Sequence, residues 1–133
     1  MTQEDLQTYN DQLKEKREKY MDLIQSFPRN QEEYSSTEWN MYNDYQEINE
    51  LLAKIKVEFV RREEKLGEKD ISEVESIAHE AHRRIRHMEN YDWDVVQQSS
   101  DENQAGFWKE IDFLETLEAA ANLEVERRSL QNS

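Results

Sequence analysis

Residues 71–88 read ISEVESIAHEAHRRIRHM, and the order of apolar and charged residues in this stretch decides the fold class. Apolar side chains recur every three or four positions: Ile71, Val74, Ile77, Ala78, Ala81, Ile85 and Met88. This spacing matches the turn of an α-helix and gathers the apolar side chains on one face. Asp70 and Glu73 have the spacing of a helix cap. We predict a helix that continues to about residue 98, with a break near Asn90 as the alternative.

The N-terminal stretch carries a similar stripe with coiled-coil spacing. Four apolar residues lie seven positions apart: Leu6, Leu13, Tyr20 and Phe27. A seam of this kind packs against another helix. Proline disfavours helical backbone at the residue before it, so Pro28 ends this helix, which we expect over residues 2–26.

Two further stretches complete the helical pattern. Ser35 and Glu38 have the spacing of a capping box, which predicts a helix over residues 36–66. Gly67 is the expected left-handed residue after its C-terminus. The last helix is expected over residues 102–130, where apolar residues again recur at helical spacing.

These stripes predict an all-α protein with a single helical domain over residues 1–133. Elongated antiparallel helical hairpins, or a four-helix bundle with coiled-coil-like seams, would bury every stripe. Two glycines and one proline argue against a many-stranded β fold, because tight hairpins favour glycine. The expected helices are 2–26, 36–66, 71–98 and 102–130.

The composition excludes several functional classes. The chain has 133 residues, 31 of them acidic and 17 basic, and a net charge of −14. It has no cysteine for a disulfide or a thiolate zinc site, and too few glycines for a phosphate-binding loop. Its charge repels nucleic acid and anionic membranes, so we expect neither as a direct partner. We expect a cytoplasmic protein, or one exported without a cleaved signal peptide, because neither a membrane span nor a leader is recognisable.

The acidic residues are not spread evenly. Residues 27–50 hold one basic and six acidic residues, and residues 88–133 hold three basic and eleven acidic ones. Nine of the 17 basic residues lie between Lys54 and Arg86. One interpretation is that a basic partner docks on the C-terminal helix. The alternative is that the acidic surface only keeps the protein soluble and pairs with bases of neighbouring helices.

We expect no enzyme activity, metal or cofactor. His79 and His82 lie on one helical face, but the sequence His-Glu-Ala-His is one residue shorter than the zinc motif H-E-x-x-H. Arg83 and Arg84 follow directly and would repel a cation. No G-x-S-x-G nucleophile motif exists, and no Glu-x-x-His pair supports a di-iron site.

Aromatic residues are the unusual feature of the chain. Most aromatics at helical spacing belong in a core, but the alternation Tyr91-Asp92-Trp93-Asp94 cannot bury every ring. Tryptophan and tyrosine are frequent at binding hot spots. We therefore select six candidates for partner binding: Tyr91, Trp93, Trp108, Asp112, Glu115 and Glu118.

The chain resembles the small all-helical accessory proteins of type VII (ESX-like) secretion, which include WXG-type proteins and partners of LXG-domain toxins. Trp108 and Asp112 match the spacing of the aromatic-x-x-x-acid targeting motif of that family, as do Tyr34 with Glu38 and Phe59 with Glu63. Residues 114–130 are similar to the tail helices of LXG-associated partners. The chain departs from the WXG type because it has no Trp-x-Gly and is longer than a simple helical hairpin.

This resemblance implies an adaptor or targeting chaperone that binds a helical partner such as a secreted toxin. Two other functions stay open from the residues themselves. The row of acids on the last helix could mimic nucleic acid in an immunity protein or a phage-encoded antagonist. The heptad seam of residues 6–27 could make a self-associating structural protein, for example a homodimer.

Overall fold

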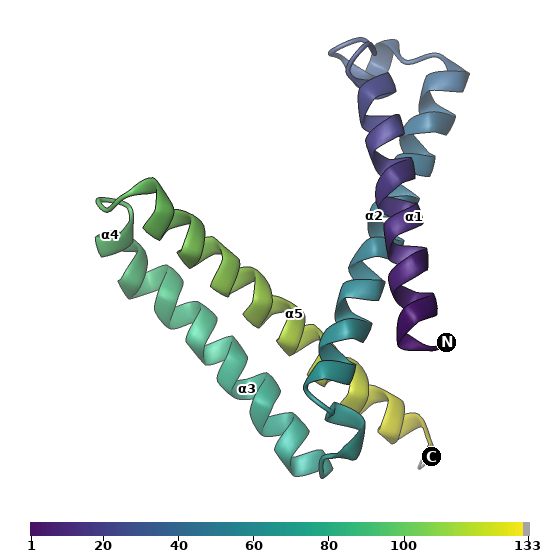
Figure 1. Ribbon diagram of the computed structural model, residues 1–133. Coiled ribbons are helices and arrows are strands. Elements are labelled where there is room, and N and C mark those ends of the chain that lie inside the picture. The colour runs from purple at the N-terminus through teal and green to yellow at the C-terminus, as the bar shows by residue number, and fades with distance from the viewer. Residues whose placement is uncertain (132–133) are drawn as a thin grey trace. The chain divides into compact units, whose positions relative to one another are not determined.

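The protein is all-α, as predicted (Figure 1). The computed structural model describes residues 1–131, and none of them forms a β-strand. The helical elements are α1 (Gln3–Ile24), η1 (Gln31–Glu33), α2 (Ser36–Glu63), η2 (Leu66–Glu68), α3 (Ile71–His87), η3 (Met88–Asp92), α4 (Trp93–Val96) and α5 (Asp101–Gln131).

The chain divides into two compact units where the sequence analysis expected a single domain. The first unit is Met1–Lys56 and the second is Val57–Ser133. Helix α2 contributes residues 36–56 to the first unit and residues 57–63 to the second. Each unit has its own buried apolar side chains, so each is described by itself.

The first unit is a helical hairpin of α1 and the adjoining part of α2. Leu6 and Leu13 of the heptad seam are buried, as are Ile48, Leu52 and Ile55 of α2. A hydrogen bond joins the two helices, since the Tyr20 hydroxyl donates to Asp44 at 3.3 Å. Burial, and then the Asp44 carboxylate, raise the pKa of Tyr20 above its ordinary value. These contacts place α1 beside α2 in Figure 1.

Local sequence sets the beginning of α2 as predicted. The Ser35 amide donates to Glu38 Oε1 at 2.8 Å, and the Glu38 amide donates to Ser35 Oγ at 3.2 Å. This is the reciprocal capping box. The predicted Asp70 cap is not formed, because the Asp70 side chain makes no capping bond. At the start of α5 the Asn103 amide donates to Ser100 Oγ at 3.2 Å, so Ser100 caps this helix.

The second unit is built on the antiparallel pair α3 and α5 (Figure 1). Small side chains allow the helices to approach closely: Ala78 and Ala81 on α3, and Ala120 and Ala121 on α5, are buried. Val60 at the end of α2 belongs to the same apolar cluster. Alanine therefore takes the positions where helices meet, which explains how a chain with few large apolar residues still forms a core.

The chain stays helical from Ile71 through residue 96, so the predicted continuation past Asn90 is found and the chain does not leave the helix there. One wide turn interrupts the α-helical pattern, because Met88–Asp92 is a π-helix. Backbone angles stay in the helical region on both sides of it, at Met88 and Trp93. π-helical turns are rare in proteins, and those that occur are often found at functional sites.

The end of α2 corrects the prediction for Gly67. Helix α2 ends at Glu63, and the left-handed residue is Lys65 with φ 53°, whereas no glycine has positive φ. The early reversal turns Leu66 inward, where it is completely buried. Gly67 instead leaves room for the Arg61 side chain, because a Cβ at this position would lie 3.1 Å from Arg61 Nη1.

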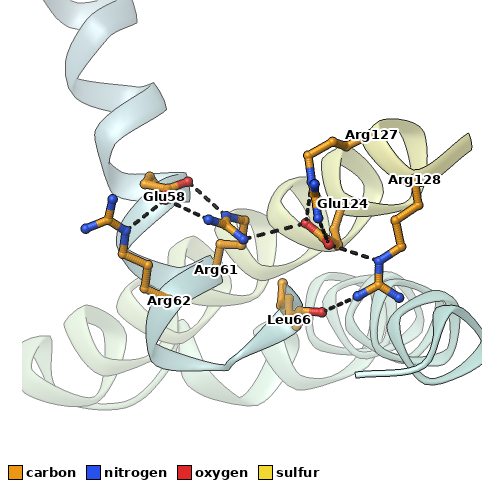
Figure 2. Close-up of polar contacts among 7 residues, drawn as sticks. All are labelled: Glu58, Arg61, Arg62, Leu66, Glu124, Arg127 and Arg128. Atoms are coloured by element: carbon orange, nitrogen blue, oxygen red, sulfur yellow. Dashed lines mark hydrogen bonds and ion pairs between the residues drawn. The ribbon is translucent and has the colours of Figure 1, made fainter. Parts of the chain in front are cut away.

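A buried carboxylate joins the end of α2, η2 and α5 (Figure 2). The side chain of Glu124 on α5 is completely shielded from solvent. It accepts hydrogen bonds from Arg127 and from Arg128 Nε at 3.0 Å, and Arg61 Nη1 of α2 lies 3.7 Å away. Arg128 also donates to the Leu66 carbonyl at 2.7 Å. One carboxylate thereby connects three elements.

Two carboxylates in this cluster have lowered pKa values. The Arg127 hydrogen bond is the main cause for Glu124, and the Arg61 hydrogen bond is the main cause for Glu58. A carboxylate whose pKa is lower in the folded state contributes stability above its ordinary pKa of 4.5. That contribution is lost as the pH falls from there through the folded-state pKa.

The first prediction concerns Glu124→Gln. Removing one member of a buried ion pair is strongly destabilising, and the partly exposed arginines reduce the cost here, so we expect a loss of about 2–3 kcal/mol at neutral pH. The variant should also lose less stability than the wild type as the pH falls below 4.5. Urea unfolding at a series of pH values measures both effects. Glu126→Gln, at an exposed neighbour on the same helix, is the control and should change stability by less than about 0.5 kcal/mol.

The second prediction concerns the left-handed residue. Glycine adopts positive φ without the steric cost of a Cβ, so Lys65→Gly should raise the free energy of unfolding by about 0.5–1 kcal/mol. Lys69→Gly, at φ −89°, is the matched control and should give no gain. Equal effects of the two glycines in urea unfolding would contradict this account of the α2 end.

Candidate functional site

Two of the predicted candidates, Trp93 and Trp108, lie against each other at the end of the second unit where α4 meets α5. Their ring centroids are 5.1 Å apart. Both rings also contact Phe107, at 5.3 Å from Trp93 and 5.1 Å from Trp108. Phe107 is buried with Met88 in a small apolar cluster. The tryptophan pair is therefore held in place by a core side chain.

The two tryptophans differ in exposure. Trp93 is half-buried and packs against the apolar cluster of Phe107, whereas Trp108 is 50% exposed. A large aromatic ring that is fixed by its neighbours and still half open to solvent is the usual form of an interface anchor. Trp93 supports the ring, and Trp108 presents it.

The predicted acids follow Trp108 along α5 at helical spacing. Asp112 is four residues beyond Trp108, Glu115 is three further and Glu118 three further again. Residues three and four apart share a helix face, so these side chains form a row along α5. Asp112 and Glu115 are exposed and Glu118 is half-buried. We call Trp93, Trp108, Asp112, Glu115 and Glu118 together the tryptophan face.

Glu118 has a structural contact as well. His82 Nδ1 of α3 lies 2.9 Å from Glu118 Oε2. This contact connects α3 to α5 at the end of the acidic row. His79 and Glu75 line a groove of about 420 Å³ beside it. Within residues 1–131, no three histidine, aspartate or glutamate side chains are placed so that they could hold a metal ion.

Tyr91 does not join the tryptophan face. It is 67% exposed and its ring lies 5.1 Å from His87 on the preceding turn. Because it precedes Trp93 by two positions, it projects from roughly the opposite side of the helix. The alternation of aromatic and acidic residues identified an exposed ring correctly, but it could not separate two sides of one helix.

The sequence analysis missed a groove between the π-helical segment and α5. Its volume is about 510 Å³, and Met88, Asp92, Val95 and Phe107 are among the residues that line it. Val95 is 73% exposed. The π turn at Met88–Asp92 shifts the register of the residues after it relative to the buried stripe of α3. Neither Trp93 nor Trp108 lines this groove.

The chain matches no known protein-family model, no curated protein and no solved structure.

None of the helices described over residues 1–131 is both long enough and apolar enough to span a membrane.

The third prediction tests the division between support and presentation. Trp93→Ala removes a ring that packs on the Phe107 cluster and should lower the free energy of unfolding by about 3 kcal/mol. Trp108→Ala removes a half-exposed ring and should cost about 1 kcal/mol. Thermal melts followed by circular dichroism measure both. Equal losses would contradict the assignment of Trp108 as the presented ring.

Proposed function

We propose that the protein is a non-enzymatic adaptor that binds a basic, helical segment of another protein through the tryptophan face. The single observation that carries this proposal is the half-exposed Trp108 ring, fixed by Trp93 and Phe107 at the head of an acidic row.

The aromatic end favours binding because little ordering is needed. Trp108 is already in contact with two other rings, so its side chain loses few conformations when a partner covers it. Burying a half-exposed tryptophan removes apolar surface from water and favours association. A partner should supply an apolar side chain to this position.

The charge around Trp108 selects the partner. Residues 88–118 contain nine acidic residues, from Glu89 to Glu118, and one basic residue, Lys109. Asp112, Glu115 and Glu118 repeat every three residues after Trp108, which matches lysine or arginine at the same spacing on a partner helix. An amphipathic helix with one apolar anchor and several basic residues satisfies both requirements.

The resemblance to type VII secretion partners gives this partner a concrete form. Trp108 and Asp112 lie one helical turn apart and both are exposed, so a partner can reach this aromatic-x-x-x-acid pair. We infer that the segment bound is a helical domain of a larger exported protein, such as an LXG-type toxin, and that the adaptor assists its targeting. Exposure of the motif supports this inference.

The fourth prediction concerns binding of a synthetic amphipathic helix built from leucine and lysine. Isothermal titration should give binding by the wild-type chain that weakens about tenfold with Trp108→Ala. The double variant Asp112→Asn, Glu115→Gln should bind more weakly at low salt and differ little from the wild type in about 0.5 M salt. Tyr91→Ala, an exposed aromatic outside the tryptophan face, is the control and should bind as the wild type does.

These titrations, together with sedimentation of the chain alone, discriminate among the functions that the sequence left open. Wild-type affinity in Trp108→Ala would overturn the adaptor proposal. Binding that disappears entirely in about 0.5 M salt, with no contribution from Trp108, would favour an acidic mimic of nucleic acid. Sedimentation of the chain alone as a dimer that Trp108→Ala dissociates would assign the tryptophan face to self-association.

A further inference from the structure

A cluster of arginines at the other end of α5 carries an inference that the adaptor function does not use. Arg61 and Arg62 of α2 and Arg127 and Arg128 of α5 surround two carboxylates, those of Glu58 and Glu124 (Figure 2). Four guanidinium groups therefore gather around two carboxylates, in a chain whose net charge is −14.

Arg61 and Arg127 come together at the Glu124 carboxylate. Arg61 uses Nε and Nη2 on Glu58, and its Nη1 lies 3.7 Å from Glu124. Arg127 uses Nε and Nη2 on the same Glu124 carboxylate. Arg128 Nε also donates to Glu124 at 3.0 Å, so three guanidinium groups from two helices converge on one carboxylate that carries a single negative charge.

Arg127 is the member of the cluster that solvent reaches most easily. Its side chain is 49% exposed, compared with 33% for Arg61 and 18% for Arg128. A guanidinium has five N–H donors, and the two bonds to Glu124 leave three of those of Arg127 directed away from that carboxylate. Glu124 is fully buried, so solvent reaches the Arg127 guanidinium on the side away from this carboxylate.

The two arginines also interact unfavourably with each other. The Glu124 hydrogen bond raises the pKa of Arg127, while the charge of Arg61 acts in the opposite direction. Two like charges held near one another favour binding of an anion that contacts both. The two guanidinium groups are preorganised, because their hydrogen bonds to Glu58 and Glu124 hold them in place before any ligand binds.

We propose that Arg61 and Arg127 bind a phosphate-type oxyanion on the solvent side of Glu124. A tetrahedral anion with several acceptor oxygens can contact guanidiniums that approach from two helices, which a flat monovalent carboxylate does less well. The ligand is either inorganic phosphate or a phosphate monoester carried by a larger molecule. Binding joins α2 to α5 and stabilises the second unit.

The experiment titrates the full-length protein with sodium phosphate at constant ionic strength, balanced with sodium chloride. The melting temperature should rise by about 5 °C at a phosphate concentration ten times the dissociation constant. Sulfate should act similarly and acetate should have little effect. Phosphoserine in place of phosphate separates the two ligand sources, because tighter binding of phosphoserine indicates a phosphate monoester and equal or weaker binding indicates inorganic phosphate.

Substitutions identify the site. Arg127→Gln should abolish the phosphate-dependent rise, and Arg127→Lys should retain a reduced one, because lysine keeps the charge and loses the planar fork. Arg83→Gln, at an exposed arginine on α3 outside the cluster, is the matched control and should respond as the wild type does. Phosphate-induced shifts of the Arg127 Nε–H signal in NMR spectra give a readout that does not depend on stability.

Three results would overturn the proposal. They are an equal rise of the melting temperature with sodium chloride alone, an unchanged phosphate response in a folded Arg127→Gln variant, and absence of an NMR shift at Arg127. None of these results bears on the tryptophan face, so this inference and the adaptor function fail or succeed separately.

Discussion

The buried carboxylate of Glu124 is the interaction on which the second unit depends. A charge without solvent contact is costly unless it is paired and hydrogen-bonded. Glu124 meets this requirement with arginines from both α2 and its own helix. The same constraint explains the neighbouring backbone, because Arg128 binds the Leu66 carbonyl and Gly67 leaves room for the Arg61 guanidinium.

The helices were predictable because their causes are local. Periodic apolar residues, the Ser35–Glu38 capping box and Pro28 fix where helices form, begin and end, and these depend on near neighbours in the chain. The division into two units was not predictable, since it depends on which stripes meet in space. Glu124 shows the limit most clearly: in the sequence it is one acid among many, and only tertiary contacts bury it.

The candidate site was predictable in part for the same reason. The i, i+4, i+7 spacing of Trp108, Asp112 and Glu115 places them on one face of any helix, so sequence alone could group them. The contact between Trp93 and Trp108 joins two elements and needed the structure. The placement of Val95 was not predictable, because a π-helical turn alters the rotation per residue and the apolar periodicity of a sequence does not signal such a turn.

The distribution of charge along α5 connects the two proposed surfaces. Helix α5 carries acids in its first turn, at Asp101 and Glu102, and arginine in its last, an arrangement that the helix dipole favours. Trp108 and Glu124 are sixteen residues apart, or about 24 Å along the helix axis, which exceeds the screening length of about 8 Å at physiological salt. An acidic surface and an arginine cluster on the same helix therefore do not neutralise each other. One helix can therefore present a face for a basic partner near its beginning and a site for an anion near its end. The net charge of the whole chain does not reveal this local separation of charge.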